Sequence, residues 1–310
     1  MVLVDSYGRP LTHARISITS RCMYRCVYCH REGLENPRDA LTIEDFEILA
    51  HVFKLAEIKF VKLTGGEPLA RNDVVDVCHV FREVMGRDLE LSIVTNGYLL
   101  EDYLPRLVNY IDRINVSLPS LDRDRYRMIT GVDGLDKVLR GLRLAREMGL
   151  RIKINVVVTK LNLDEIPRII EFCRVNGIDA NIIELLPLGI DGDTFRSLYA
   201  SLDGLEEHLR RAASRYEVRD FHARPVYVLP EGVRIEVIRS IHNPSMCAHC
   251  TRIRVTPDGY FKTCLRRSND LVPFIDVLRS ELSVEEKIRG VFERLVLANR
   301  MRRPYAQRSV

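Results

Sequence analysis

The sequence predicts an α/β protein built on a parallel sheet. Over the first two-thirds of the chain, short runs rich in Val, Ile or Leu alternate with helix-period segments, and each run is followed by turn or cap residues. A strand followed by a helix, repeated about six times, is typical of parallel strands joined by right-handed crossovers. Two architectures satisfy the pattern, an open doubly wound sheet and a barrel, which need not be complete. The predicted strands are residues 15–19, 60–64, 91–95, 113–118, 152–158 and 180–185.

The helices between these strands are predicted from periodicity and from end signals. Thr42 is an N-cap candidate with Asp45 three residues on, which is a variant of the capping box. Glycines follow the apolar pattern where three helices are expected to stop, at Gly86, Gly149 and Gly177. The predicted helices are residues 42–58, 72–85, 135–148 and 163–176.

The last third of the chain has a different pattern. A helix is expected around 198–213, followed by short irregular strands, a tight turn at Pro257-Asp258-Gly259 and a final helix over 284–299. We therefore expect two parts, an α/β unit over 1–215 and an extension over 216–310 packed on it. The predicted strands of the extension are residues 226–229, 234–238, 252–256 and 260–264.

Composition excludes several classes of protein. With 47 basic and 43 acidic residues the net charge is +4, which is too small to indicate a nucleic-acid partner by itself. The apolar stretches are too short to span a bilayer, so no membrane association is expected. The first ten residues contain no apolar core of a secretory signal. These features predict a cytoplasmic protein.

Eight cysteines carry the main functional signal. In a cytoplasmic protein, clustered cysteines indicate metal or redox sites rather than disulfides. Two cysteines, Cys78 and Cys173, lie within helical patterns and are expected to be inert core thiols. The remaining six form two groups that lie far apart in the sequence: Cys22, Cys26 and Cys29, and then Cys247, Cys250 and Cys264.

Each group provides three thiolates and no obvious fourth ligand. A zinc site of the Cys3His type remains open for both groups, with His30 in the first and His249 or His242 in the second. The alternative is a [4Fe–4S] cluster in which one iron has no protein ligand and is open to a substrate or cofactor.

The first group resembles the signature of the radical S-adenosylmethionine (SAM) enzymes. The resemblance lies in Cys22-x3-Cys26-x-Tyr28-Cys29 after the first strand, and the segment Thr64-Gly65-Gly66-Glu67-Pro68 is similar to the family's segment that binds the SAM amino group. It implies that one [4Fe–4S] cluster binds and cleaves SAM. The positions that match SAM contacts of the family are Tyr28, Gly66, Ser117 and Leu186.

The second group resembles the molybdenum cofactor biosynthesis protein A family, the GTP 3′,8-cyclases. The similarity runs from Cys247-x2-Cys250 through Thr251-Arg252-Ile-Arg254 to Cys264. It implies a second [4Fe–4S] cluster whose open iron binds guanine. Cations suit a triphosphate, and arginine forms bidentate phosphate contacts. The positions that match GTP contacts are Arg15, Lys62, Thr95, Lys153, Arg252 and Arg254.

From this resemblance we expect an incomplete (β/α)6 TIM-like barrel with a C-terminal α+β extension that carries the second iron–sulfur cluster. The expected reaction is radical conversion of GTP to 3′,8-cyclo-7,8-dihydro-GTP, the first step of molybdenum cofactor biosynthesis, by a lyase. SAM-derived 5′-deoxyadenosyl radical abstracts hydrogen from C3′ of GTP, with an unidentified low-potential electron donor. Members tend to be dimers, which implies a homodimer.

Three departures from the family pattern bear on the details. Asn181 stands where the family frequently has an arginine, and Leu186 stands where many members have a methionine. The chain ends Arg308-Ser309-Val310, whereas many members end in a double-glycine tail that reaches the active site. Two other functions remain to be distinguished: a radical SAM enzyme that modifies a peptide, and a zinc-stapled α/β binding protein.

Overall fold

Twelve strands form one continuous sheet. The computed structural model describes residues 2–35, 37–241 and 243–306. The strand order is β12-β11-β10-β1-β2-β3-β4-β5-β6-β9-β8-β7. The central strands β1 to β6 are adjacent in sequence order and parallel, as the alternating pattern predicts. Their bounds are β1 His13–Ser17, β2 Phe60–Thr64, β3 Glu90–Thr95, β4 Arg113–Ser117, β5 Arg151–Val158 and β6 Asp179–Glu184.

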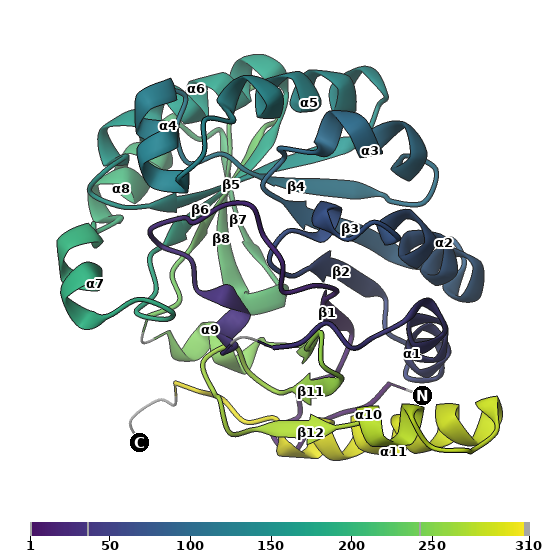
Figure 1. Cartoon of the computed structure of the whole chain (residues 1–310). Helices are drawn as coiled ribbons and strands as arrows, with labels where there is room; N and C mark the ends of the chain where they lie inside the picture. Colours follow the sequence, from purple (N-terminus) through teal and green to yellow (C-terminus); the bar gives the residue numbers. More distant parts are fainter. Residues whose placement is uncertain (1, 36, 242, 307–310) are drawn as a thin grey trace.

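The predicted helices cover the outer side of this curved sheet (Figure 1). Helix α1 (Ile43–Leu55) begins at the predicted capping box, in which the Thr42 side chain accepts from Asp45 N and the Asp45 side chain accepts from Thr42 N. Helix α6 (Ile166–Asn176) stops at Gly177, whose φ of 65° favours glycine. The other two predicted helices are α2 (Val74–Met85) and α5 (Leu135–Glu147).

Several short helices of the described residues were not predicted from the sequence. One of them, α3 (Leu100–Leu107), begins without a capping side chain and contains Pro105. Another is α4 (Arg123–Thr130). The helix expected at 198–213 is found as α8 (Asp203–Ala212), and residue 198 instead ends a separate unpredicted helix, α7 (Gly192–Leu198).

The C-terminal strands extend both edges of the central sheet. On one side β9 (Arg234–Ile238) pairs parallel to β6, followed by antiparallel β8 (Arg224–Val228) and β7 (Arg215–Arg219). On the other side β10 (Arg252–Val255) pairs parallel to β1. Antiparallel β11 (Tyr260–Lys262) and β12 (Leu271–Pro273) complete that edge. The expected extension is therefore part of the same sheet, and a division at residue 215 stays a prediction.

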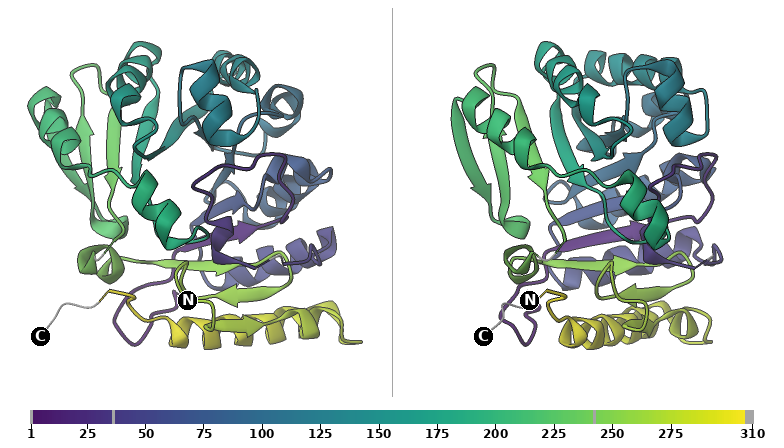
Figure 2. Two further views of the ribbon diagram at one scale, coloured as in Figure 1. Left: turned by 60° about the vertical axis from the view of Figure 1, so that its left-hand side comes forward. Right: turned by 90° about the vertical axis from the view of Figure 1, so that its left-hand side faces the viewer.

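The remaining helices lie near the C-terminal strands. They are α9 (Pro244–Ala248), α10 (Ile275–Leu278) and α11 (Val284–Met301), the last beginning at a Ser283–Glu286 capping box. Helix α11 packs against α1 and β12, so the chain's last long helix covers its first (Figure 2). No helix in the described ranges is long and apolar enough to cross a membrane.

Candidate active site

The two cysteine groups line one cavity of about 600 Å³. The residues around it come from the ends of the central strands and from the C-terminal strands. The carboxyl ends of parallel strands are where α/β folds bind ligands. Of the residues singled out in the sequence, the cavity is lined by all six clustered cysteines and by Arg15, Tyr28, Lys62, Gly66, Thr95, Ser117, Leu186, Arg252 and Arg254.

Gly65 and Gly66 hold the first cysteine loop close to strand β2. A Cβ atom on Gly65 would lie 2.2 Å from Thr19 O, and one on Gly66 would lie 2.4 Å from Arg21 O. Gly66 N also donates to Thr19 O at 2.8 Å. Any side chain at these positions would push the loop away. The two glycines thus have a structural reason to be there in addition to the expected contact with SAM.

Glu67, next in this segment, binds the end of β3. Its carboxylate accepts from Thr95 Oγ1 and from Asn96 N, both at 2.6 Å. Burial raises the pKa of Glu67 to about 7, against the opposite effect of these hydrogen bonds. The Thr95 hydroxyl, expected to contact substrate, therefore already has a partner in the protein.

The second cysteine group is assembled by a helix and a hairpin. Cys247 lies in α9, Cys250 precedes β10, and Cys264 follows β11 after the predicted tight turn. Ala306 N donates to Cys247 Sγ at 3.4 Å, and Arg302 donates to Cys250 O at 2.5 Å. Residues that follow α11 thus form hydrogen bonds with two of the three cysteines in this group.

Both cysteine groups suit an iron–sulfur cluster. All six thiols are free and face the shared cavity. Backbone N–H groups donate to sulfur in each, including Tyr24 N to Cys22 Sγ at 3.4 Å. Among the described residues, no three His, Cys, Asp or Glu side chains converge closely enough to hold a single metal ion. Of the histidines weighed as a fourth zinc ligand, His242 lies outside the described residues.

One carboxylate bridges two arginines that come from different strands of the cavity wall. Glu32, in the short 3-10 helix η1 (Arg31–Gly33) after Cys29, lies 2.5 Å from Arg15 Nη2 and 2.6 Å from Arg254 Nη1. It is only 6% exposed. The two guanidinium groups hold its pKa well below the usual range although burial acts in the opposite direction.

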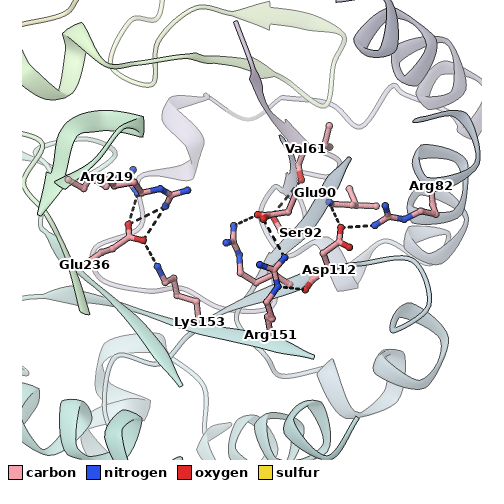
Figure 3. Close-up of polar contacts among 12 residues, drawn as sticks. Val61, Arg82, Glu90, Ser92, Asp112, Arg151, Lys153, Arg219 and Glu236 are labelled. Carbon is pink, nitrogen blue, oxygen red and sulfur yellow. Dashed lines mark hydrogen bonds and ion pairs between the residues drawn. The ribbon is translucent and has the colours of Figure 1, made fainter. Parts of the chain in front are cut away.

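Lys153 does not line this cavity. Its ammonium group is buried in an ion pair with Glu236 of β9, which Arg219 also contacts at 3.1 Å (Figure 3). Lys153 and Arg219 line a small inner chamber of about 40 Å³. Asn181 lines both spaces and donates to Asn155 Oδ1 at 2.7 Å.

The remaining two cysteines are core residues. Cys78 in α2 and Cys173 in α6 are both 0% exposed, and burial raises the pKa of Cys173 to about 12. An acidic thiol at a buried apolar position is disfavoured, so neither is suited to metal binding or catalysis.

Comparison with known proteins identifies the family. Residues 16–173 match the model of the radical SAM superfamily, and residues 178–305 match the model called Molybdenum Cofactor Synthesis C. A protein of Saccharolobus islandicus named probable GTP 3′,8-cyclase is 38% identical over 97% of this chain and 98% of its own. The chain belongs to the GTP 3′,8-cyclase family of radical SAM proteins. A second relative of the same name, from Sulfurisphaera tokodaii, is 39% identical over 97% of this chain and 96% of its own.

Solved structures have a similar fold. Native anSMEcpe with bound AdoMet and the Kp18Cys peptide superposes with a TM-score of 0.64 at 16% identity, over 94% of this chain and 84% of its own. SuiB of Streptococcus suis, bound to precursor peptide SuiA, gives a TM-score of 0.65 at 18% identity. That match covers 91% of this chain and 64% of SuiB, so this chain spans less than two thirds of SuiB.

Several cavity residues of this GTP 3′,8-cyclase family member were missed in the sequence. Glu32 follows Cys29 by three positions, and an acidic residue in a cysteine loop was a usable signal. His222 and Arg224 gave none, and neither did Phe221 of the inner chamber, because the short 3-10 helix η4 (Phe221–Ala223) at this place has no periodicity.

Proposed function

We propose that the protein converts GTP to 3′,8-cyclo-7,8-dihydro-GTP by SAM-dependent radical chemistry, in the first step of molybdenum cofactor biosynthesis. One observation carries the proposal: two cysteine triads, more than 200 residues apart in the sequence, line a single cavity together with partly buried arginine and lysine side chains. Such a cavity can hold a redox cofactor and a polyanionic substrate side by side. The names of the family models and of the relatives agree with it.

The first cysteine group would hold a [4Fe–4S] cluster and SAM. When bound, the cluster supplies the electron that splits SAM into methionine and a 5′-deoxyadenosyl radical. The protein's part is to orient SAM and exclude water. We assign this to Tyr28, Gly66, Ser117 and Leu186, which line the cavity around Cys22, Cys26 and Cys29. Glu67 fixes the end of β3 beside them through Thr95 and Asn96.

The second cysteine group and its strand would hold GTP. Cys247, Cys250 and Cys264 would carry the second [4Fe–4S] cluster, and Arg252 and Arg254 lie on β10 between them. Strand residues alternate in direction, so both arginines are on one face, toward the cavity. Arg15 and Lys62 approach from β1 and β2. A substrate fixed at several points presents its ribose to the radical with little lost freedom.

Lys153 is assigned a supporting role, unlike the residues that line the cavity. Glu236 and Lys153 form a buried pair behind the cavity wall, so we propose that Lys153 supports the phosphate end of GTP from a second layer (Figure 3). We further propose that the curved sheet acts as the incomplete (β/α)6 barrel, which residues 216–310 close on its open side. The low-potential electron donor, the homodimer and the cytoplasmic location stay predictions of the sequence.

The test is an anaerobic assay of the reconstituted protein with SAM, GTP and a strong reductant. We expect 5′-deoxyadenosine and cyclised GTP in equal amounts by mass spectrometry. If 5′-deoxyadenosine forms but GTP is unchanged, the SAM site stands and the substrate is wrong, which would reopen the peptide-modifying function. If a protein with full iron content gives neither product, the enzymatic function is refuted.

A matched pair of variants separates the two clusters. Cys264→Ser should lower the iron content and abolish cyclised GTP, whereas SAM cleavage to 5′-deoxyadenosine continues at the first cluster. The control Cys78→Ser changes a fully buried core thiol and should keep the iron content of the wild type. Equal iron content in the wild type and Cys264→Ser would contradict a second cluster at this site.

A further inference from the structure

Two buried arginines bind the backbone of the second cysteine group. Arg302 Nη2 donates to Cys250 O at 2.5 Å, and Arg9 Nη1 donates to Cys247 O at 2.8 Å. Arg302 is 1% exposed and Arg9 is 6% exposed. The two arginines come from opposite ends of the chain, before β1 and after α11. An uncharged donor would satisfy a carbonyl oxygen equally well, and buried charge is costly, so the two guanidinium groups need a further reason.

One carboxylate binds both arginines. Asp5 Oδ2 accepts from Arg9 Nε at 2.8 Å and lies 3.5 Å from Arg302 Nη2. The other oxygen, Asp5 Oδ1, accepts from the backbone N–H groups of Tyr7 and Arg9 at 2.9 and 3.0 Å. Asp5 is only 6% exposed. We refer to Asp5, Arg9 and Arg302 as the Asp5 group. It carries two positive charges and one negative charge, so a net positive charge is buried beside Cys247 and Cys250.

The fold fixes both halves of the Asp5 group. Asp5 N donates to Arg9 O at 3.1 Å, which closes a tight turn before β1. Arg302 follows α11 directly, and its Nη1 donates to the buried side chain of Asn299 at 2.9 Å. The first residues of the chain thus lie against the end of α11 (Figure 2). Charges that are held in this way stay in place when the charge of a neighbouring group changes.

The first cysteine group has no comparable neighbours. In the part of the chain that the structure describes, no arginine or lysine donates to a carbonyl or sulfur of Cys22, Cys26 or Cys29. The donors to Cys22 Sγ are Tyr24 N and the Asn96 side chain, and both are uncharged. The buried charges are therefore specific to the second cysteine group and are not a general requirement of a cysteine loop.

A fixed positive charge favours the more negative oxidation state of a redox centre beside it. When a [4Fe–4S] cluster accepts one electron it passes from the 2+ to the 1+ state, and its potential depends on the charges and hydrogen bonds around it. Charges in a buried setting are weakly screened, so they act more strongly than charges at the surface. The two arginines should therefore ease reduction at the second cysteine group, and Asp5 should oppose them.

We propose that Arg9 and Arg302 raise the reduction potential of the cluster at the second cysteine group, and that Asp5 limits the rise. The inference rests on the proposed function for the presence of this cluster, but not for the identity of the substrate. All three are positioning residues, because they act through the backbone of Cys247 and Cys250 and through their charge.

A redox titration followed by electron paramagnetic resonance tests this in the absence of GTP. The full chain with Cys22, Cys26 and Cys29 replaced by serine holds only the second cluster, so the signal of the reduced state belongs to it alone. If this chain binds no iron, the wild type is titrated instead, and one of its two midpoints must move as stated below.

The variants should move the midpoint potential in opposite directions. Arg302→Met removes a positive charge and should lower the equilibrium constant for reduction about tenfold, which is about 59 mV for one electron. Asp5→Asn removes the negative charge and should raise the potential. Arg302→Lys keeps the charge and should restore most of the loss. The control Arg140→Gln, which removes an arginine from an exposed pair with Glu101, should leave the potential unchanged.

The opposite signs separate this inference from a merely structural role. Shifts of one sign in Arg302→Met and Asp5→Asn, or no shift in either, refute the proposal. Should Arg302→Met lose its iron, Arg9→Gln decides: it must lower the potential, and an unchanged potential or a second loss of iron refutes the proposal. Potentials that shift as stated in a protein that does not cyclise GTP would support this inference and overturn only the proposed function. A protein that cyclises GTP with unshifted potentials would do the reverse.

Discussion

Two pairs of partly buried cationic side chains line this cavity, and they differ in how their charge is balanced. Arg15 and Arg254 share Glu32, which lies within 2.6 Å of both. Lys62 and Arg252, next to Phe221, share no carboxylate among the described residues. The first group is complete in the nucleotide-free protein. The second pair has no carboxylate, and under the proposed function the phosphates of GTP would balance its charge.

The largest effect is expected for the balanced group. Glu32→Gln removes the buried carboxylate that Arg15 and Arg254 share, and removing one partner of a buried pair costs about 3–5 kcal/mol. We expect that decrease in the unfolding free energy from denaturant titration. Glu101→Gln breaks an exposed pair with Arg140 and should cost less than about 1 kcal/mol. Equal losses would mean that Glu32 is not the counter-ion of this wall.

The unbalanced group should respond with the opposite sign. Arg252→Met removes a partly buried cation that has no carboxylate partner, so the nucleotide-free protein should gain about 1–2 kcal/mol of unfolding free energy. The same variant should lose the stabilisation by GTP, which is about 2.7 kcal/mol for a ligand at a hundred times its Kd. Thermal unfolding with and without GTP measures both. A destabilised nucleotide-free variant would contradict the comparison.

Acid should destabilise the surroundings of Phe221 through its histidines. The pKa of His13 is about 2 in the folded protein and 6.5 in the unfolded chain. Below pH 6.5 the unfolded state therefore binds more protons, and the free energy of unfolding decreases as the pH is lowered. One such group costs up to about 1.4 kcal/mol for each pH unit in this range. His13→Phe keeps the stacking on Phe60 and Phe221 and should reduce the slope between pH 6.5 and 5.5. An unchanged slope in urea titrations would show that His13 is protonated in the folded protein.

The smallest effect is expected at the SAM side. Leu186 lines the cavity where many family members have methionine, and the two side chains are similar in volume. Such swaps usually change stability or binding by less than about 1.5 kcal/mol. Leu186→Met should therefore leave SAM affinity within about tenfold. A larger change would give this position a specific role that packing does not explain.

The sequence predicted the parallel sheet well because each central strand is a short apolar run followed by a turn. β2 is found at its predicted residues, Phe60–Thr64. The pairing of β9 and β10 with opposite edges of the sheet could not be predicted, because it depends on contacts between residues far apart in the chain, such as Arg15 opposite Arg254. The hydrophobic pattern determines a strand's face but does not identify its neighbour.

Prediction of the site residues from the sequence was limited in the same way. The cysteines were identified from spacing, and the structure brings all six to one cavity. Glu32, Phe221 and Arg224 were missed, because a counter-ion or a cation–π partner is defined by neighbours in space and has no sequence period. Lys153 was expected at the cavity, but its partner Glu236 lies on β9, whose position beside β6 is a tertiary property.

The most direct test of the central claim uses GTP with deuterium at C3′ of the ribose. In the anaerobic reaction with SAM, our account predicts deuterium in 5′-deoxyadenosine, in step with cyclised GTP. This result would show that the two halves of the cavity bring SAM and the GTP ribose together. Unlabelled 5′-deoxyadenosine alongside cyclised GTP would place the radical at another carbon, and labelled GTP recovered intact beside 5′-deoxyadenosine would show that this cavity acts on another substrate.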